Sequence, residues 1–179
     1  FHSVLFFRAD APPRCLGDLH SVRAAWVAET SSSGYLVTRL ALKRQGVDLA
    51  SAFATNTFFG THRAVAVAVM DGRADVGSTF ANFGDGDVAG GLRHAGFHDV
   101  AGSDGARILD VGGPIPADMI VAHPDVPIRD RINFAAAMSR LPSDPVGGVP
   151  IRRVMGADGF APVLHDALLE LQELLAAAD

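Results

Sequence analysis

The sequence lacks several features that would assign the chain to a common functional class. It contains a single cysteine, Cys15, which excludes an internal disulfide and any cysteine-based metal cluster. No apolar stretch approaches the roughly 20 residues that a membrane span requires. Lysine and arginine form no cluster with aromatic residues, and the net charge is −5. No nucleic-acid partner is therefore expected.

No signal peptide is recognised either, and the chain starts with Phe1 and not with methionine. We expect a processed or excised piece, in which the lack of a signal peptide says little about localisation. Core material is plentiful, since 49% of the residues are apolar and 20% are charged, as in a packed globular protein. The length of 179 residues suits one full domain, or one lobe and part of another.

Short apolar segments alternate with helical patterns along the chain. Strands are predicted at 3–8, 22–28, 51–55, 74–80 and 107–111, and helices at 34–45, 61–70, 127–139 and 164–178. Residues 85–105 are interpreted as a helix and a surface loop, with His94 and His98 in solvent because no third metal ligand follows at a suitable spacing. The alternation predicts an α/β fold with a mixed, mostly parallel sheet and a ligand site at the carboxyl ends of its strands.

Three consecutive serines, Ser31, Ser32 and Ser33, precede Gly34 where the second strand gives way to the first helix. A helix start carries unpaired N–H groups and a partial positive charge, so it attracts anions. The hydroxyls add donors, and the glycine lets backbone and ligand approach closely. The alternative is an ordinary N-cap, in which serine binds the N–H groups of its own helix.

A second polar turn, Thr61-His62, opens the second helix. His62 can donate from either ring nitrogen to an oxyanion, or it can simply cap backbone groups. Both turns follow a strand of the predicted parallel sheet, so both are expected at the same edge.

Four short blocks then occur in a characteristic order. They are Phe-His-Ser-Val-Leu at 1–5, Ser-Ser-Ser-Gly-Tyr at 31–35, a segment running from Gly-Thr-His at 60–62 to Asp-Val-Gly at 75–77, and Gly-Pro-Ile-Pro-Ala-Asp at 113–118. Together they resemble the phosphate, phosphite and phosphonate substrate-binding proteins of ABC transporters, which have the class II periplasmic binding fold. Residues 156–160 are similar to the closing segment of that family.

The resemblance implies a two-lobed clamp that grips the oxygens of a small oxyanion. The residues that it assigns to ligand binding are Ser31, Ser32, Ser33, Gly34, Tyr35, Thr61, His62, Thr79 and Asp118. Asp118 is expected at the hinge side of the cleft, where it would bind a ligand amine or a protonated oxygen. The alternative roles are core packing for Tyr35 and Phe80, and a turn after proline for Asp118. No catalytic residue, metal or cofactor is expected.

The resemblance also implies a division of the chain. Residues 1–21 would form a hinge strand and the entry to the second lobe, 22–112 the α/β lobe that carries the oxyanion site, and 113–179 the return hinge with the C-terminal helical part of the first lobe. The family has a further stretch before the position of Phe1, so we expect one complete lobe and part of the other. Arg63 departs from the family, which commonly has an acidic residue there; it either adds a cation near the anion or faces solvent.

The function implied is that of a solute-binding component of an ABC transporter, periplasmic or extracytoplasmic and possible as a lipoprotein. Its partners would be phosphonate, phosphate or phosphite and a membrane permease, and a second copy of the chain could cover the edge left by the absent part of the first lobe. A sensory domain of the same fold is the alternative. An enzyme is disfavoured, because no cysteine lies near His62 or Asp118 in sequence and no glycine-rich nucleotide loop is present.

Overall fold

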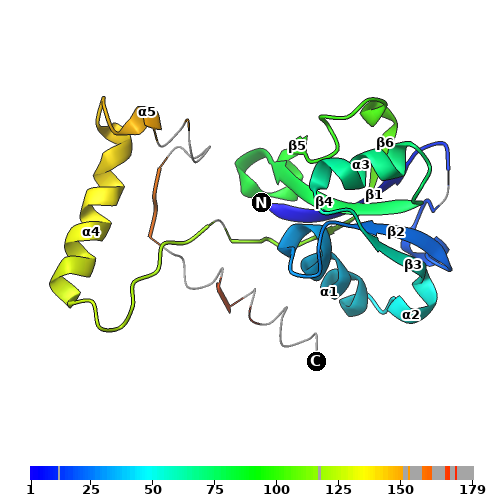
Figure 1. Cartoon of the computed structure of the whole chain (residues 1–179), viewed down its shortest axis with the longest axis horizontal. Coiled ribbons are helices and arrows are strands. Elements are labelled where there is room, and N and C mark those ends of the chain that lie inside the picture. Colours follow the sequence, from blue (N-terminus) through cyan, green and yellow to red (C-terminus); the bar gives the residue numbers. More distant parts are fainter. Residues whose placement is uncertain are drawn as a thin grey trace. The chain divides into compact units, whose positions relative to one another are not determined.

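The computed structural model describes residues 1–11, 13–116, 118–150, 153, 159–162, 168, 169 and 172 (Figure 1). The chain divides into one compact unit that contains Phe1–Ala117 and a second that comprises Asp118–His165. The helix predicted at 164–178 lies outside the described residues except for Leu168, Leu169 and Gln172.

The first unit is built on a six-stranded sheet with the order β3-β2-β4-β1-β6, and β5 pairs with β4. The strands are β1 (His2–Arg8), β2 (Val22–Trp26), β3 (Phe53–Phe58), β4 (Val76–Phe83), β5 (Leu92–Ala95) and β6 (Ala106–Gly112). In β1, Val4 lies opposite Thr79 of β4 and Val111 of β6. The predicted α/β fold with a mixed sheet is confirmed.

The sheet contains more antiparallel pairing than the alternating sequence pattern suggests. β2 is parallel to β3 and β4, whereas β1 is antiparallel to β4 and β6, and β5 is antiparallel to β4. A parallel neighbour needs a long crossover connection, usually a helix. Such helices join β2 to β3 and β3 to β4, so the parallel part of the sheet is confined to these strands.

The helix predicted within 85–105 is wrong. The segment forms short 3₁₀ turns at Gly84–Gly86, Val88–Gly90 and Ser103–Gly105, with β5 between the second and third. Glycine recurs through this segment and is unfavourable in a helix interior. β4 therefore passes to β5 through a tight connection, which produces the antiparallel pair.

Helices cover both faces of the sheet (Figure 1). They are α1 (Val37–Arg44), α2 (Leu49–Ala52) and α3 (His62–Met70). Side chains of β1 alternate between two clusters, since Phe6 packs with Val65 and Val69 of α3, whereas Leu5 packs with Trp26 and Leu42 on the other face. The sheet is thus buried on both sides, as expected when helices flank it.

The second unit contains α4 (Ile128–Arg140), a 3₁₀ turn at Leu141–Ser143 and α5 (Gly148–Pro150). α4 confirms the helix predicted at 127–139. Three large apolar side chains of α4 are more than half exposed, namely Ile128 at 64%, Ile132 at 61% and Phe134 at 51%. Among the helices in the described ranges, none combines the length and apolar character needed to cross a membrane.

Candidate functional site

The serine turn follows β2 and leads through one π-helical turn, Ser32–Leu36, into α1. Ser31 has extended backbone angles, and its Oγ accepts a hydrogen bond of 3.1 Å from the N–H of Gly34. The Leu36 N–H donates to the Ser31 carbonyl at 3.0 Å. Ser31 therefore acts as the N-cap that the alternative interpretation of the sequence describes.

The other two serines occupy different environments. Ser33 is buried, and its carbonyl accepts a hydrogen bond of 2.9 Å from Oγ of Ser78 in β4. Because that hydroxyl uses its hydrogen there, Thr38 of α1 donates to Ser78 Oγ across 2.6 Å. Ser32 is the exposed member of the three. The hydrogen bond from Ser78 thus attaches the serine turn to β4, and the Ser32 hydroxyl remains accessible to solvent.

Gly34 allows the turn to close against the end of β2. A Cβ atom at this position would lie 2.3 Å from Cγ2 of Val27 and 2.8 Å from Oγ of Ser31. The Val27 N–H also donates to the Gly34 carbonyl at 3.2 Å. Only glycine permits this approach, so Gly34 fixes where the first N–H groups of the helical segment lie.

Tyr35 is packed into an aromatic group rather than standing apart from the core. Its ring meets Trp26 edge to face at a centroid distance of 5.3 Å, and it meets Phe58 at 5.2 Å. The Arg39 guanidinium lies over the same ring at 5.1 Å. These contacts match the core-packing alternative that the sequence left open for this tyrosine.

The second polar turn joins β3 to α3 and lies beside the serine turn. The Gly60 N–H donates to the Val27 carbonyl at 2.8 Å, which ties the end of β3 to the end of β2. Thr61 Oγ1 accepts a hydrogen bond of 3.1 Å from the Ala64 N–H, so Thr61 is the N-cap of α3. His62 is the first residue of the helix, at its partially positive end.

The half-buried imidazole of His62 is held by β4. Its Nδ1 lies 2.9 Å from Oγ1 of Thr79, a fully buried residue, and the ring meets Phe80 edge to face at 5.1 Å. Burial lowers the pKa of His62 below its usual value. The ring is therefore neutral near pH 7, with one donor and one acceptor nitrogen.

Several contacts around His62 were not predicted from the sequence. The backbone of Gly96, after β5, packs so closely that a Cβ there would lie 2.1 Å from Thr79 Oγ1. The Arg63 guanidinium donates to the Asp99 carbonyl at 2.7 Å, and Arg63 is exposed, which matches the solvent-facing alternative for this residue. Only strand pairing brings residues 96–99 next to α3, so no local sequence signal indicated their role.

Successive residues of β4 connect the two turns, because Ser78 contacts the serine turn and Thr79 contacts His62. Side chains of neighbouring strand residues point to opposite faces, so β4 supports one turn from each face. Asp118 is exposed and belongs to the second unit. No group of three potential metal ligands occurs within the described part of the chain.

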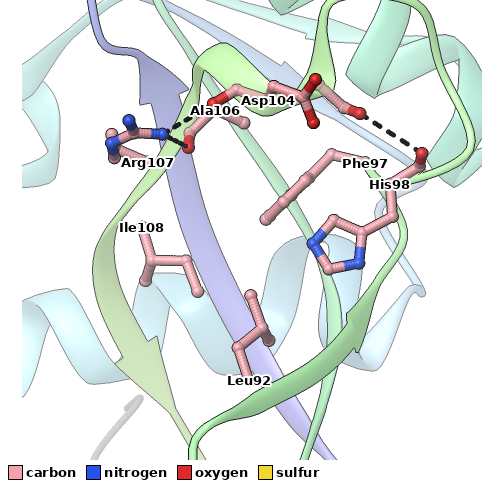
Figure 2. Close-up of a pocket in the computed structure, with 8 residues that line it drawn as sticks. Leu92, Phe97, His98, Asp104, Ala106, Arg107 and Ile108 are labelled. Atoms are coloured by element: carbon pink, nitrogen blue, oxygen red, sulfur yellow. Dashed lines mark hydrogen bonds between the residues drawn. The ribbon is translucent and has the colours of Figure 1, made fainter.

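A separate pocket of about 320 Å³ lies between β5 and β6 (Figure 2). Leu92, Phe97 and Ile108 line its apolar interior. Its polar groups bind one another, since Ser103 Oγ donates to the His98 carbonyl at 3.3 Å and Arg107 donates to the Asp104 carbonyl at 2.8 Å. None of the residues predicted to bind ligand lines this pocket.

Comparison with known proteins identifies a family that matches most of the chain. The family described as "ABC transporter, phosphonate, periplasmic substrate-binding protein" matches residues 1–168. This is a binding-protein family and not an enzyme family. No curated protein sequence matches the chain at a significant level.

Several solved structures share the fold. XAC2383 from Xanthomonas citri bound to ATP matches with a TM-score of 0.77 and 23% identity, over 99% of this chain and 65% of that one. A binding protein component of an ABC phosphonate transporter from Pseudomonas aeruginosa has a TM-score of 0.67 and 17% identity, over 97% and 56%. PhnD1 from Prochlorococcus marinus in complex with methylphosphonate has a TM-score of 0.61 and 16% identity, over 99% and 66%.

The chain thus spans about three fifths of the length of these structures, from 56% to 66%. At these identities the likeness establishes the fold, whereas the family match extends over most of the sequence. The chain belongs to the family of periplasmic substrate-binding proteins of phosphonate ABC transporters.

Proposed function

We propose that this chain carries the oxyanion-binding lobe of a solute-binding component of an ABC transporter, and that its ligand is phosphonate, phosphate or phosphite. The observation that carries the proposal is the position of two helix starts side by side. The helical segment from Ser32 and helix α3 begin after the parallel neighbours β2 and β3, whose ends are joined by the Gly60 to Val27 hydrogen bond.

Helix starts of this kind bind anions without a formal positive charge. The first N–H groups of each helix have no partner within the helix, and the partial positive charge at each helix start favours an anion. The caps at Ser31 and Thr61 each take one N–H, which leaves other donors of both helix starts for a ligand. The exposed Ser32 hydroxyl and the neutral His62 ring supply further donors.

The ligands of the structural relatives share one chemical feature. Methylphosphonate and ATP both contain a tetrahedral phosphorus centre with anionic oxygens, and these are the molecules bound in two of the related structures. We infer that the same group is recognised here by residues 31–34 and 61–62. Asp118 is proposed to contribute to recognition of the remainder of the ligand, whereas the Tyr35 ring, packed on Trp26 and Phe58, supports the serine turn.

We further propose an extracytoplasmic location and a membrane permease as partner. Within this scheme residues 1–21 form a hinge strand and the entry to the second lobe, and 22–112 form the lobe that holds the oxyanion. Residues 113–179 form the return hinge and the C-terminal helical part of the first lobe. Family membership supports the transport role.

Ligand-dependent thermal unfolding of the chain tests the proposal with phosphate, phosphite and methylphosphonate, each at matched ionic strength. A ligand present at 100 times its Kd should stabilise the chain by about 2.7 kcal/mol, which raises the Tm by roughly 5–10 °C. Ser32→Ala and His62→Gln should each weaken binding about 10- to 100-fold, because each removes a hydrogen bond to a charged group.

Exposed residues of the same types provide the controls. Ser139→Ala in α4 and His20→Gln should bind as tightly as the wild type, since both side chains are exposed outside the two turns. If none of the three anions stabilises the chain at millimolar concentration, the proposal is refuted. Unchanged affinity in both turn variants would also refute it.

A further inference from the structure

The Thr79 hydroxyl is enclosed between the His62 ring and the backbone of Gly96. Thr79 has no exposed surface, and a Cβ at position 96 would lie 2.1 Å from its Oγ1. The Gly96 N–H donates to the Phe80 carbonyl at 3.1 Å, which holds this segment against β4. A ligand at the strand ends therefore meets His62 and not Thr79.

The direction of the hydrogen bond between Thr79 and His62 follows from this enclosure. Among the described residues, Nδ1 of His62 is the only hydrogen-bond partner of Thr79 Oγ1. A buried hydroxyl that only accepted would leave its own hydrogen unpaired, which is costly. Thr79 therefore donates, Nδ1 accepts, and the ring hydrogen of the neutral imidazole is carried by Nε2.

Three further features keep the ring neutral and fixed. The positive end of the α3 dipole disfavours an imidazolium at the first position of the helix. Phe80 packs edge to face against the ring at 5.1 Å, and the bond from Arg63 to the Asp99 carbonyl at 2.7 Å ties the start of α3 to the turn after Gly96. The ring thus has few orientations available.

We propose that Thr79 is a positioning residue, which holds His62 as the Nε2–H tautomer and so presents a single N–H donor to the oxyanion. The inference rests on the proposed function and changes the role expected for Thr79, which acts through His62 and not by direct contact with ligand. Gly96 is the residue that makes room for this arrangement.

Nitrogen-15 NMR of the His62 ring in the ligand-free chain at pH 7.5 tests the inference, with His62→Gln identifying the signals. The wild type should show Nε2 protonated and Nδ1 as a hydrogen-bonded acceptor. Thr79→Val, which keeps the volume but lacks the hydroxyl, should lose the acceptor signature and bind methylphosphonate about 3- to 10-fold more weakly. Thr79→Ser should retain the ring spectrum and the affinity of the wild type.

Each other outcome overturns the assignment. A protonated Nδ1 in the wild type contradicts it directly, and equal losses in Thr79→Val and Thr79→Ser would give Thr79 a packing role only. If Thr79→Val does not fold, the wild type and Thr79→Ser spectra still decide. A wild-type chain that binds no methylphosphonate, phosphite or phosphate would refute the proposed function, whereas the ring spectrum tests the positioning role without ligand.

Discussion

Replacing Gly34 with alanine should destabilise the chain by about 1–3 kcal/mol, because the added methyl group overlaps a packed side chain. The new Cβ would lie 2.3 Å from Cγ2 of Val27, so the serine turn must move away from β2. We expect at least a 10-fold loss of affinity for methylphosphonate, since the N–H groups of the turn move with the backbone. Urea unfolding and calorimetric titration measure the two effects.

Two variants separate this clash from a general cost of removing glycine. Gly17→Ala should be nearly neutral, because the nearest atom to its Cβ would be Sγ of Cys15 at 3.6 Å. Val27→Gly, added to Gly34→Ala, should restore part of the lost affinity, since it removes Cγ2 and Cβ of Val27, which would lie 2.3 and 2.6 Å from the new methyl carbon. Wild-type stability and affinity in Gly34→Ala would show that the turn does not depend on the close approach.

Replacing Trp26 with alanine should lower the free energy of unfolding by about 3–5 kcal/mol, the range for large buried aromatic residues. Trp26 is fully buried, contacts Tyr35 and Phe53 edge to face, and donates from Nε1 to Asn56 Oδ1 at 2.9 Å. Loss of the indole ring leaves a cavity between β2 and the aromatic rings of Tyr35 and Phe53. The midpoint of urea unfolding measures the change.

Phe58 offers a matched control for Trp26, because it belongs to the same aromatic group but is 39% exposed. Phe58→Ala should cost only about 1 kcal/mol, as expected for one edge-to-face contact at the surface. Equal losses for the two variants would mean that the core of this face is not centred on Trp26.

The sequence predicted the parts of the site that depend on local pattern. Two local patterns each lie within a few residues of a helix start. They are the consecutive serines before Gly34, and Thr61-His62 before an alanine-rich segment. Both turns are found where they were predicted, at the ends of neighbouring parallel strands. Local patterns also predicted α3 and the buried β1, because each contains a continuous apolar segment.

The remaining features depend on strand register and on packing between distant segments. Ser78 and Thr79 follow one another in β4, but only the pairing of the strand decides that one contacts Ser33 and the other His62. No local sequence pattern indicated that Gly96 packs against Thr79, because the two residues are distant in sequence. The turns of 84–91 were missed because the glycines of this segment do not reveal that β4 and β5 pair across it.

A titration of the nitrogen-15-labelled chain with methylphosphonate, followed by amide and imidazole NMR, tests whether the two turns bind the oxyanion. We expect the largest saturable shifts at the amides of residues 32–34 and 61–64 and at Nε2 of His62. Shifts confined to the pocket between β5 and β6, around Leu92 and Arg107, or the absence of saturable shifts in the two turns, would contradict it.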